Sequence, residues 1–243
     1  MERKVSTKKY LIAFILTVLI FAGGIGIGIM FENIRLNYSE QVILSEKVGL
    51  RSLQLQQNYI DTGIADCTTL HQIVETNINE LGKKMGEVIE YEKRSFLNEE
   101  EFKLQLQDYF LTEIQFLLTS QEIDKKCKKD SVKIIYFYGE DQFDTQGDIL
   151  GYIKKLFGSK VLIFSFNSNF KQEPMISILL TSYNISELPA IVIENDVYQG
   201  HRTVEQVLES VCETFLTMKI DVPPECEETL KATPLQLAGE KKN

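Results

Sequence analysis

The sequence has no tryptophan, no proline before Pro174 and no pair of cysteines separated by two residues. Because proline is missing from the first 173 residues, no proline forbids long helices in the first half of the chain. With only two histidines, His71 and His201, and no Cys-x-x-Cys pair, the chain lacks the ligands of a typical zinc site. It also has no glycine-rich phosphate loop and no serine-hydrolase elbow.

One long apolar run stands near the start of the chain. Residues 10–31 contain no charged side chain. About 20 apolar residues at about 1.5 Å each cross a hydrocarbon layer of about 30 Å. A cleaved signal peptide is the competing interpretation, but the run is longer than a typical signal core and no Ala-x-Ala site follows it. The run therefore predicts an uncleaved transmembrane anchor.

Charge predicts the orientation of this anchor. Residues 1–9 are basic, with Arg3, Lys4, Lys8 and Lys9, and such residues stay in the cytoplasm. The sequence thus predicts a single-pass protein of the cell membrane with its C-terminal part extracytoplasmic.

Because the net charge is −9 and the first 30 residues carry +3, the rest carries −12. An acidic ectodomain argues against nucleic acid as a partner.

Residues 32–130 have the pattern of a helical stalk that contains a hairpin. Apolar residues recur at steps of three and four over 67–88 and again over 102–117. Between them, Asn98 and Glu101 resemble a capping box after a turn near 93–98. The apolar stripes are wide enough to pack on something beyond the hairpin. The preceding helix, the following domain and a second copy of the chain all remain open.

The region 131–218 alternates short strands and helices, which is typical of an α/β domain. The patterns predict strands at 131–138, 161–166, 190–194 and 197–199, and helices at 145–157, 174–183 and 203–218. The last two strands join across Asn195-Asp196 as a hairpin. The strands are apolar on both faces, as expected of strands covered by helices. Residues 219–243 form a proline-containing tail that we expect to be irregular.

Three local features give this region a family likeness. They are the apolar run Ile134–Tyr138 followed by a polar turn, the segment Leu188-Pro189-Ala190 entering a strand, and Gly200 before the last helix. In this order they resemble the thioredoxin-like superfamily. The resemblance implies a thioredoxin-like α/β domain, preceded here by a transmembrane helix and a helical hairpin. It also implies a cis peptide bond before Pro189.

The chain departs from that family where the chemistry occurs. The family places two cysteines at the start of its first core helix, and the matching positions here are Gln142 and Thr145. No cysteine lies between Cys127 and Cys212, so no shift of the alignment restores the pair. The resemblance therefore implies that the redox activity is lost. We expect no catalytic residue and no cofactor.

The resemblance also implies a surface for extended peptide. In the family, the turn after the first strand and the cis-proline loop form one contact surface. The corresponding residues are Asp141, Gln142, Phe143, Asp144, Thr145, Leu188 and Pro189.

The four cysteines suit structural roles. Cys67 precedes the outgoing arm of the hairpin and Cys127 follows the returning arm, so the two return to one end. The segment after the last helix can fold back to bring Cys226 beside Cys212. We therefore predict the disulfides Cys67–Cys127 and Cys212–Cys226, although four cysteines allow three pairings.

Two groups of residues could in principle bind a metal, but an ordinary structural role explains each of them better. Cys67 and His71 lie four apart on one helix, but too few further ligands exist. The carboxylates Glu140, Asp141, Asp144 and Asp148 lack the spacing of a calcium loop and suit a helix start. We expect no metal site.

The favoured function is a membrane-anchored, extracytoplasmic, redox-inactive thioredoxin-like module that binds or scaffolds a protein partner. The alternative is a membrane-tethered thiol-disulfide oxidoreductase that uses its non-standard cysteines. A third reading is a homo-oligomer that associates through its stalk or through the GxxxG spacing of Gly24 and Gly28.

Overall fold

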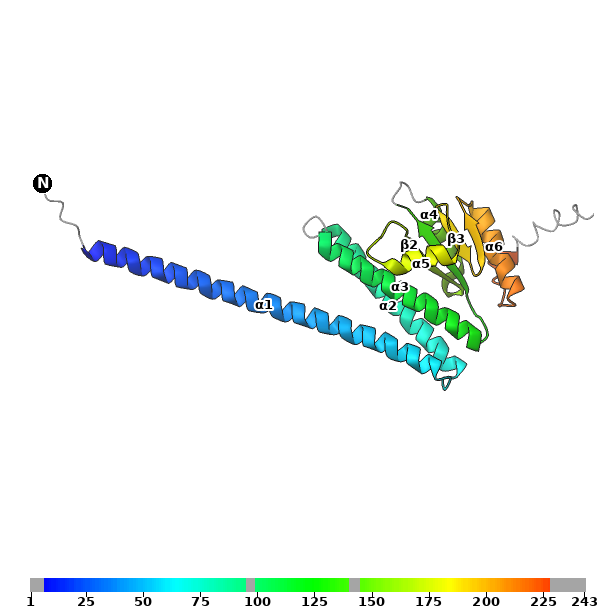
Figure 1. Cartoon of the computed structure of the whole chain (residues 1–243), viewed down its shortest axis with the longest axis horizontal. Coiled ribbons are helices and arrows are strands. Elements are labelled where there is room, and N and C mark those ends of the chain that lie inside the picture. The colour runs from blue at the N-terminus through cyan, green and yellow to red at the C-terminus, as the bar shows by residue number, and fades with distance from the viewer. Residues whose placement is uncertain (1–6, 95–98, 140–144, 228–243) are drawn as a thin grey trace, which may run out of the picture. The chain divides into compact units, whose positions relative to one another are not determined.

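The structure is a computed structural model that describes residues 7–94, 99–139 and 145–227. Two compact units divide at Tyr59 and Ile60. The helices α1 to α6 and the strands β2 and β3 are labelled in Figure 1. The elements are α1 (Thr7–Asp61), α2 (Cys67–Arg94), α3 (Glu99–Lys126), β1 (Val132–Tyr138), α4 (Thr145–Phe157), β2 (Val161–Asn167), α5 (Pro174–Ser182), β3 (Ala190–Ile193), β4 (Asp196–Gln199) and α6 (Val204–Thr217), with a 3₁₀ turn, η2 (Gly158–Lys160), between α4 and β2.

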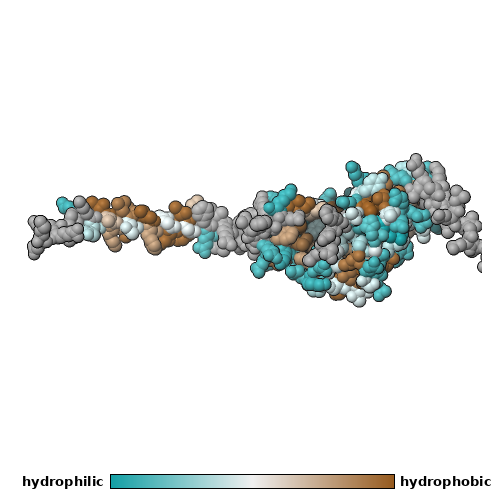
Figure 2. Space-filling model, turned by 90° about the horizontal axis from the view of Figure 1, so that it is seen from above, coloured by the Kyte–Doolittle hydropathy of each residue, from teal (hydrophilic) through white to brown (hydrophobic). Residues whose placement is uncertain are grey.

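The first unit is made of α1. Its segment Tyr10–Met30 is long and apolar enough to cross a membrane, and a signal sequence would pass the same test. None of this segment is buried, and its apolar side chains form the brown surface of the helix in Figure 2. The helix ends at Asp61, and Gly63 follows with φ +69°, a conformation that suits glycine.

In the second unit, α2 and α3 form the predicted hairpin, and α3 packs on the sheet. Phe116 of α3 lies edge-on to Phe164 of β2, with ring centroids 5.3 Å apart. Phe110 lies 5.2 Å from Phe170. The hairpin thus buries its apolar stripe against the α/β region. The sequence alone did not decide which partner this stripe packs against. Of the turn expected near 93–98, Lys93 and Arg94 instead end α2, and residues 95–98 lie outside the described residues.

The sheet has four strands in the order β2-β1-β3-β4. β1 and β2 are parallel, with Val132 opposite Val161, whereas β3 is antiparallel to both β1 and β4. Alternate residues of β1 enter two different cores. Ile135 and Phe137 face the cluster shared with α3 and α5, and Ile134 and Tyr136 face the cluster shared with α4 and α6.

This arrangement is an α/β domain after a helical segment, as the sequence predicts. The bond between Leu188 and Pro189 is cis. Gly200 has φ +81°, a conformation that suits glycine. The first part of the expected irregular tail is packed, since Ile220 and Cys226 are buried beside α6.

Candidate functional site

The residues expected to contact a partner are only partly described. Asp141, Gln142, Phe143 and Asp144 lie outside the described residues, as does Glu140. Thr145 is the exposed first residue of α4. Leu188 is 38% exposed, and Pro189 is half-buried directly before β3.

Three segments that are distant in sequence meet at the start of α4. The Thr145 hydroxyl lies 3.1 Å from His201 Nε2. The Gln146 side-chain oxygen accepts a hydrogen bond of 2.7 Å from the backbone N–H of Arg202. The N–H of Gly200 donates to the carbonyl of Pro189 at 2.8 Å. These bonds bring Thr145 and the Leu188–Pro189 loop to one surface, which we call the α4 face: Thr145, Leu188, Pro189, His201 and Arg202.

Sequence reasoning missed two members of this face, His201 and Arg202. The Arg202 guanidinium lies over the ring of Tyr198, 4.5 Å from its centroid, which holds the cation at the end of β4. The only sequence signal that could have placed these residues on the α4 face is their position directly after Gly200. The bonds to Thr145 and Gln146 span 56 residues, so no local pattern reveals them.

The loop before Pro189 is held in place by one side chain. The Gln199 Oε1 atom accepts hydrogen bonds from the N–H groups of Ser186 and Glu187, at 2.7 and 2.8 Å. It also lies 3.1 Å from the Ser186 hydroxyl. This anchoring presents Leu188 as an exposed apolar group beside polar neighbours, an arrangement suited to contact with a polypeptide.

All four cysteines are paired as the sequence predicts. Cys67–Cys127 and Cys212–Cys226 form disulfides with Cα–Cα distances of 5.7 and 5.4 Å. The Cys67–Cys127 disulfide precedes β1 in the chain, whereas Thr145 follows β1. The face that includes Thr145 has no thiol among its described residues.

Polar groups with unusual environments lie at the junction of the hairpin with the sheet. Lys133, 3% exposed, donates to Asp124 at 2.5 Å. Glu194 accepts from Lys129 at 2.9 Å and from the N–H of Lys133 at 2.8 Å. Burial raises the pKa of Asp124, although the Lys133 ammonium acts in the opposite direction. The network ties the end of α3 to β1 and to the β3–β4 turn.

Cys67, weighed above with His71 as a metal ligand, has its sulfur in a disulfide. His71 Nδ1 instead lies 3.5 Å from an oxygen of Asp130. Among the side chains that the structure describes, no three of the His, Cys, Asp and Glu types gather as metal ligands.

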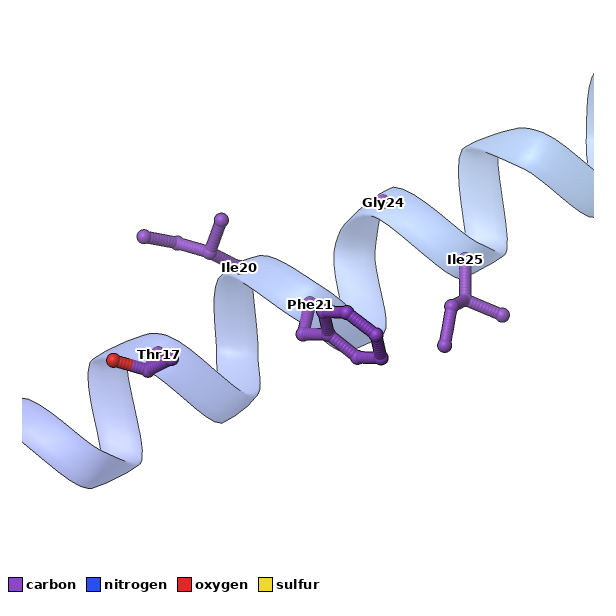
Figure 3. Close-up of a pocket in the computed structure, with 5 residues that line it drawn as sticks. All are labelled: Thr17, Ile20, Phe21, Gly24 and Ile25. Atoms are coloured by element: carbon purple, nitrogen blue, oxygen red, sulfur yellow. The ribbon is translucent and has the colours of Figure 1, made fainter.

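The apolar helix α1 carries a shallow groove. Figure 3 shows Gly24, which has no side chain, between Ile20 and Ile25, with Thr17 and Phe21 completing the lining. A Cβ added at Gly24 or Gly28 meets no atom within 4 Å. Close approach of a second helix there remains a prediction.

Comparison with known proteins adds little. No protein-family model and no curated protein matches the chain. A solved structure described as "Structure of a malarial protein" matches 36% of this chain and 99% of its own, with 12% identity and a TM-score of 0.30. A similarity this low carries no argument about function.

Proposed function

We propose that the protein is a single-pass membrane protein whose extracytoplasmic, thioredoxin-like domain binds a partner polypeptide without redox turnover. The observation that carries this proposal is the α4 face. At the position matching the second cysteine of the family's pair, Thr145 contacts His201, and every cysteine is held in a disulfide elsewhere.

The membrane topology rests on two supports. The apolar segment Tyr10–Met30 follows a basic stretch, which favours a cytoplasmic N-terminus. Disulfides persist in oxidising compartments outside the cytosol. The two disulfides of the second unit are therefore consistent with an extracytoplasmic domain.

The family assignment of the domain is supported by the order of its elements. A parallel pair, β1 and β2, is extended on one side by the antiparallel strands β3 and β4. The loop entering β3 lies beside the start of the first helix after β1, through the bonds of Gly200 and Arg202. This is the relationship that the thioredoxin-like family uses to hold extended peptide.

The α4 face offers both kinds of contact that a peptide needs. Leu188 supplies an exposed apolar group, and Thr145, His201 and Arg202 supply hydrogen-bonding groups around it. The loop that carries Leu188 is anchored before any partner arrives, which reduces the entropy cost of binding.

Photocrosslinking in native membranes tests the proposal. A photoreactive amino acid at Leu188 should capture one discrete polypeptide, identified by mass spectrometry. Leu216 of α6 is the matched control, since it is also a leucine and is 50% exposed. Capture of the same species from both positions, or of nothing from Leu188, would contradict a binding role for this face.

A further inference from the structure

The two disulfides differ in their access to solvent. Cys212 and Cys226 are both fully buried, within a cluster that includes Phe157 and Phe215. Cys67 is exposed, and Cys127 is half-buried against a small cluster at the base of the hairpin. A thiol in solution therefore reaches Cys67 directly, whereas the other bond must first be exposed by local unfolding.

Cys67 lies at a helix start. It is the first residue of the 28-residue helix α2. The preceding Asp66 caps the helix, with its carboxylate accepting from the N–H of Thr69 at 2.8 Å. A helix start favours a thiolate released there, whereas the neighbouring Asp66 carboxylate opposes it. Cys127 lies at the opposite kind of end, directly after α3, with its N–H bonded to the carbonyl of Ile123.

Charges of both signs surround the bond. Lys125, Lys126 and Lys128 flank Cys127, and Lys125 and Lys126 both contact the carboxylate of Glu122. Asp130 contacts His71. The local charges largely balance, so the exposure of Cys67, rather than a net positive field, makes it the sulfur that an incoming thiol reaches first.

We propose that Cys67–Cys127 is a thiol-exchange site at the base of the hairpin, with Cys67 as the sulfur that bonds to the incoming thiol. In the first step, an external thiolate attacks Cys67 Sγ, a mixed disulfide forms, and the electron pair of the broken S–S bond leaves on Cys127, which takes up a proton. A second external thiol then attacks the mixed disulfide and releases Cys67 as a thiolate. The external dithiol, or pair of thiols, is oxidised to a disulfide, and the protein gains two thiols.

Opening the Cys67–Cys127 bond affects the base of the α2–α3 hairpin. The staple closes a 60-residue separation, and beneath it lie the buried side chains of Ile60, Leu70 and Ile123. Lys126 Nζ donates to the carbonyl of Ile60 at 2.5 Å. After reduction, these contacts and the pair of His71 with Asp130 remain at the hairpin base. The proposal concerns this base and does not rest on the α4 face.

The test uses the full-length protein in native membranes. Samples are exposed without denaturant to reduced glutathione or, separately, to reduced thioredoxin, then quenched with an alkylating reagent and mapped by mass spectrometry. We expect Cys67–Cys127 to open on the order of 100-fold faster than Cys212–Cys226 with at least one reagent. Reaction with glutathione assigns the site to small thiols, and reaction with thioredoxin alone assigns it to protein dithiols. Equal rates for the two bonds, faster opening of Cys212–Cys226, or no opening by either reagent would overturn the proposal.

Two variants test the role of Cys67. With oxidised glutathione, Cys127→Ser should form a mixed disulfide at Cys67 on the order of 10-fold faster than Cys67→Ser forms one at Cys127. Equal or reversed rates would contradict the assignment of Cys67. If either variant fails to accumulate, the site of the first glutathione adduct on the wild-type protein decides the same question.

Discussion

The carboxyl oxygen Oε1 of Glu113, on α3, accepts a hydrogen bond of 2.6 Å from the backbone N–H of Ser165, on β2. β2 is an edge strand of the sheet, so this bond satisfies a backbone donor that the sheet itself leaves unpaired. Glu113 is 1% exposed, and its second oxygen has no hydrogen-bond partner. Burial raises the pKa of this carboxyl well above its usual value.

The raised pKa of Glu113 predicts a pH-dependent stability. The folded state keeps a proton on Glu113 that the unfolded chain releases above its ordinary pKa of about 4.5, so the unfolding free energy falls as pH rises from there. Denaturant unfolding at pH 5 and pH 8 should show this loss for the wild type. Glu113→Gln should remove the part of this loss of unfolding free energy that ionisation of Glu113 causes. The variant should therefore be more stable than the wild type at pH 8 by about 1–3 kcal/mol.

Glu100→Gln is the control for this experiment, because Glu100 is an exposed residue of the same helix. It should retain the wild-type pH dependence. An identical slope in wild type and Glu113→Gln would show that Glu113 ionises equally in the folded and unfolded states.

The buried ion pair of Lys133 with Asp124 predicts a large cost for removing one partner. Lys133→Met leaves the partly buried Asp124 carboxylate without its closest cation and should lower the unfolding free energy by about 3–5 kcal/mol. Adding Asp124→Leu should recover much of that loss. Lys83→Met serves as the surface control, since Lys83 lies 3.9 Å from Glu87 on an exposed face, and it should change stability by less than about 1 kcal/mol. A similar cost for both lysines would contradict the role given to burial.

Loss of the hairpin staple should destabilise the domain through the unfolded chain. Replacing both Cys67 and Cys127 by serine frees a separation of 60 residues, which costs about 4 kcal/mol in the chain-entropy model. Thermal or urea unfolding of the double variant measures the change. A loss below about 1 kcal/mol would mean that the unfolded chain is already compact at this site.

The anchoring of the Leu188 loop by Gln199 predicts a local effect. Gln199→Ala removes the acceptor shared by the N–H groups of Ser186 and Glu187, so hydrogen exchange at these two amides should accelerate. Global stability should fall by less than about 1.5 kcal/mol, since the side chain is exposed. Val197→Ala, an exposed position on the same strand, should leave both amides unchanged. Unchanged exchange in Gln199→Ala would show that the loop is held by other contacts.

Much of the fold could be predicted from local pattern, because the relevant residues are close in sequence. The apolar run of β1 and the alternation of helices and strands need only short-range periodicity. Cys67 and Cys127 could be paired because two helices of similar length return the chain to one end.

The features that the sequence does not predict depend on contacts between segments that are distant along the chain. His201 and Arg202 join the candidate face only because β4 ends beside α4. Glu113 is buried because α3 runs along the edge of β2, and its position on the helix does not reveal that neighbour. The difference between the two disulfides likewise follows from packing, since all four cysteines look alike in the sequence.

The central claim is that the α4 face binds a polypeptide without redox chemistry. The most direct measurement is the affinity of the full-length protein for the polypeptide captured at Leu188, with no reductant or oxidant present. Leu188→Asp should weaken binding by about 10-fold or more, whereas Leu216→Asp should leave it unchanged. Equal loss in both variants, or a complex that exists only as a mixed disulfide with a cysteine of this chain, would contradict the claim.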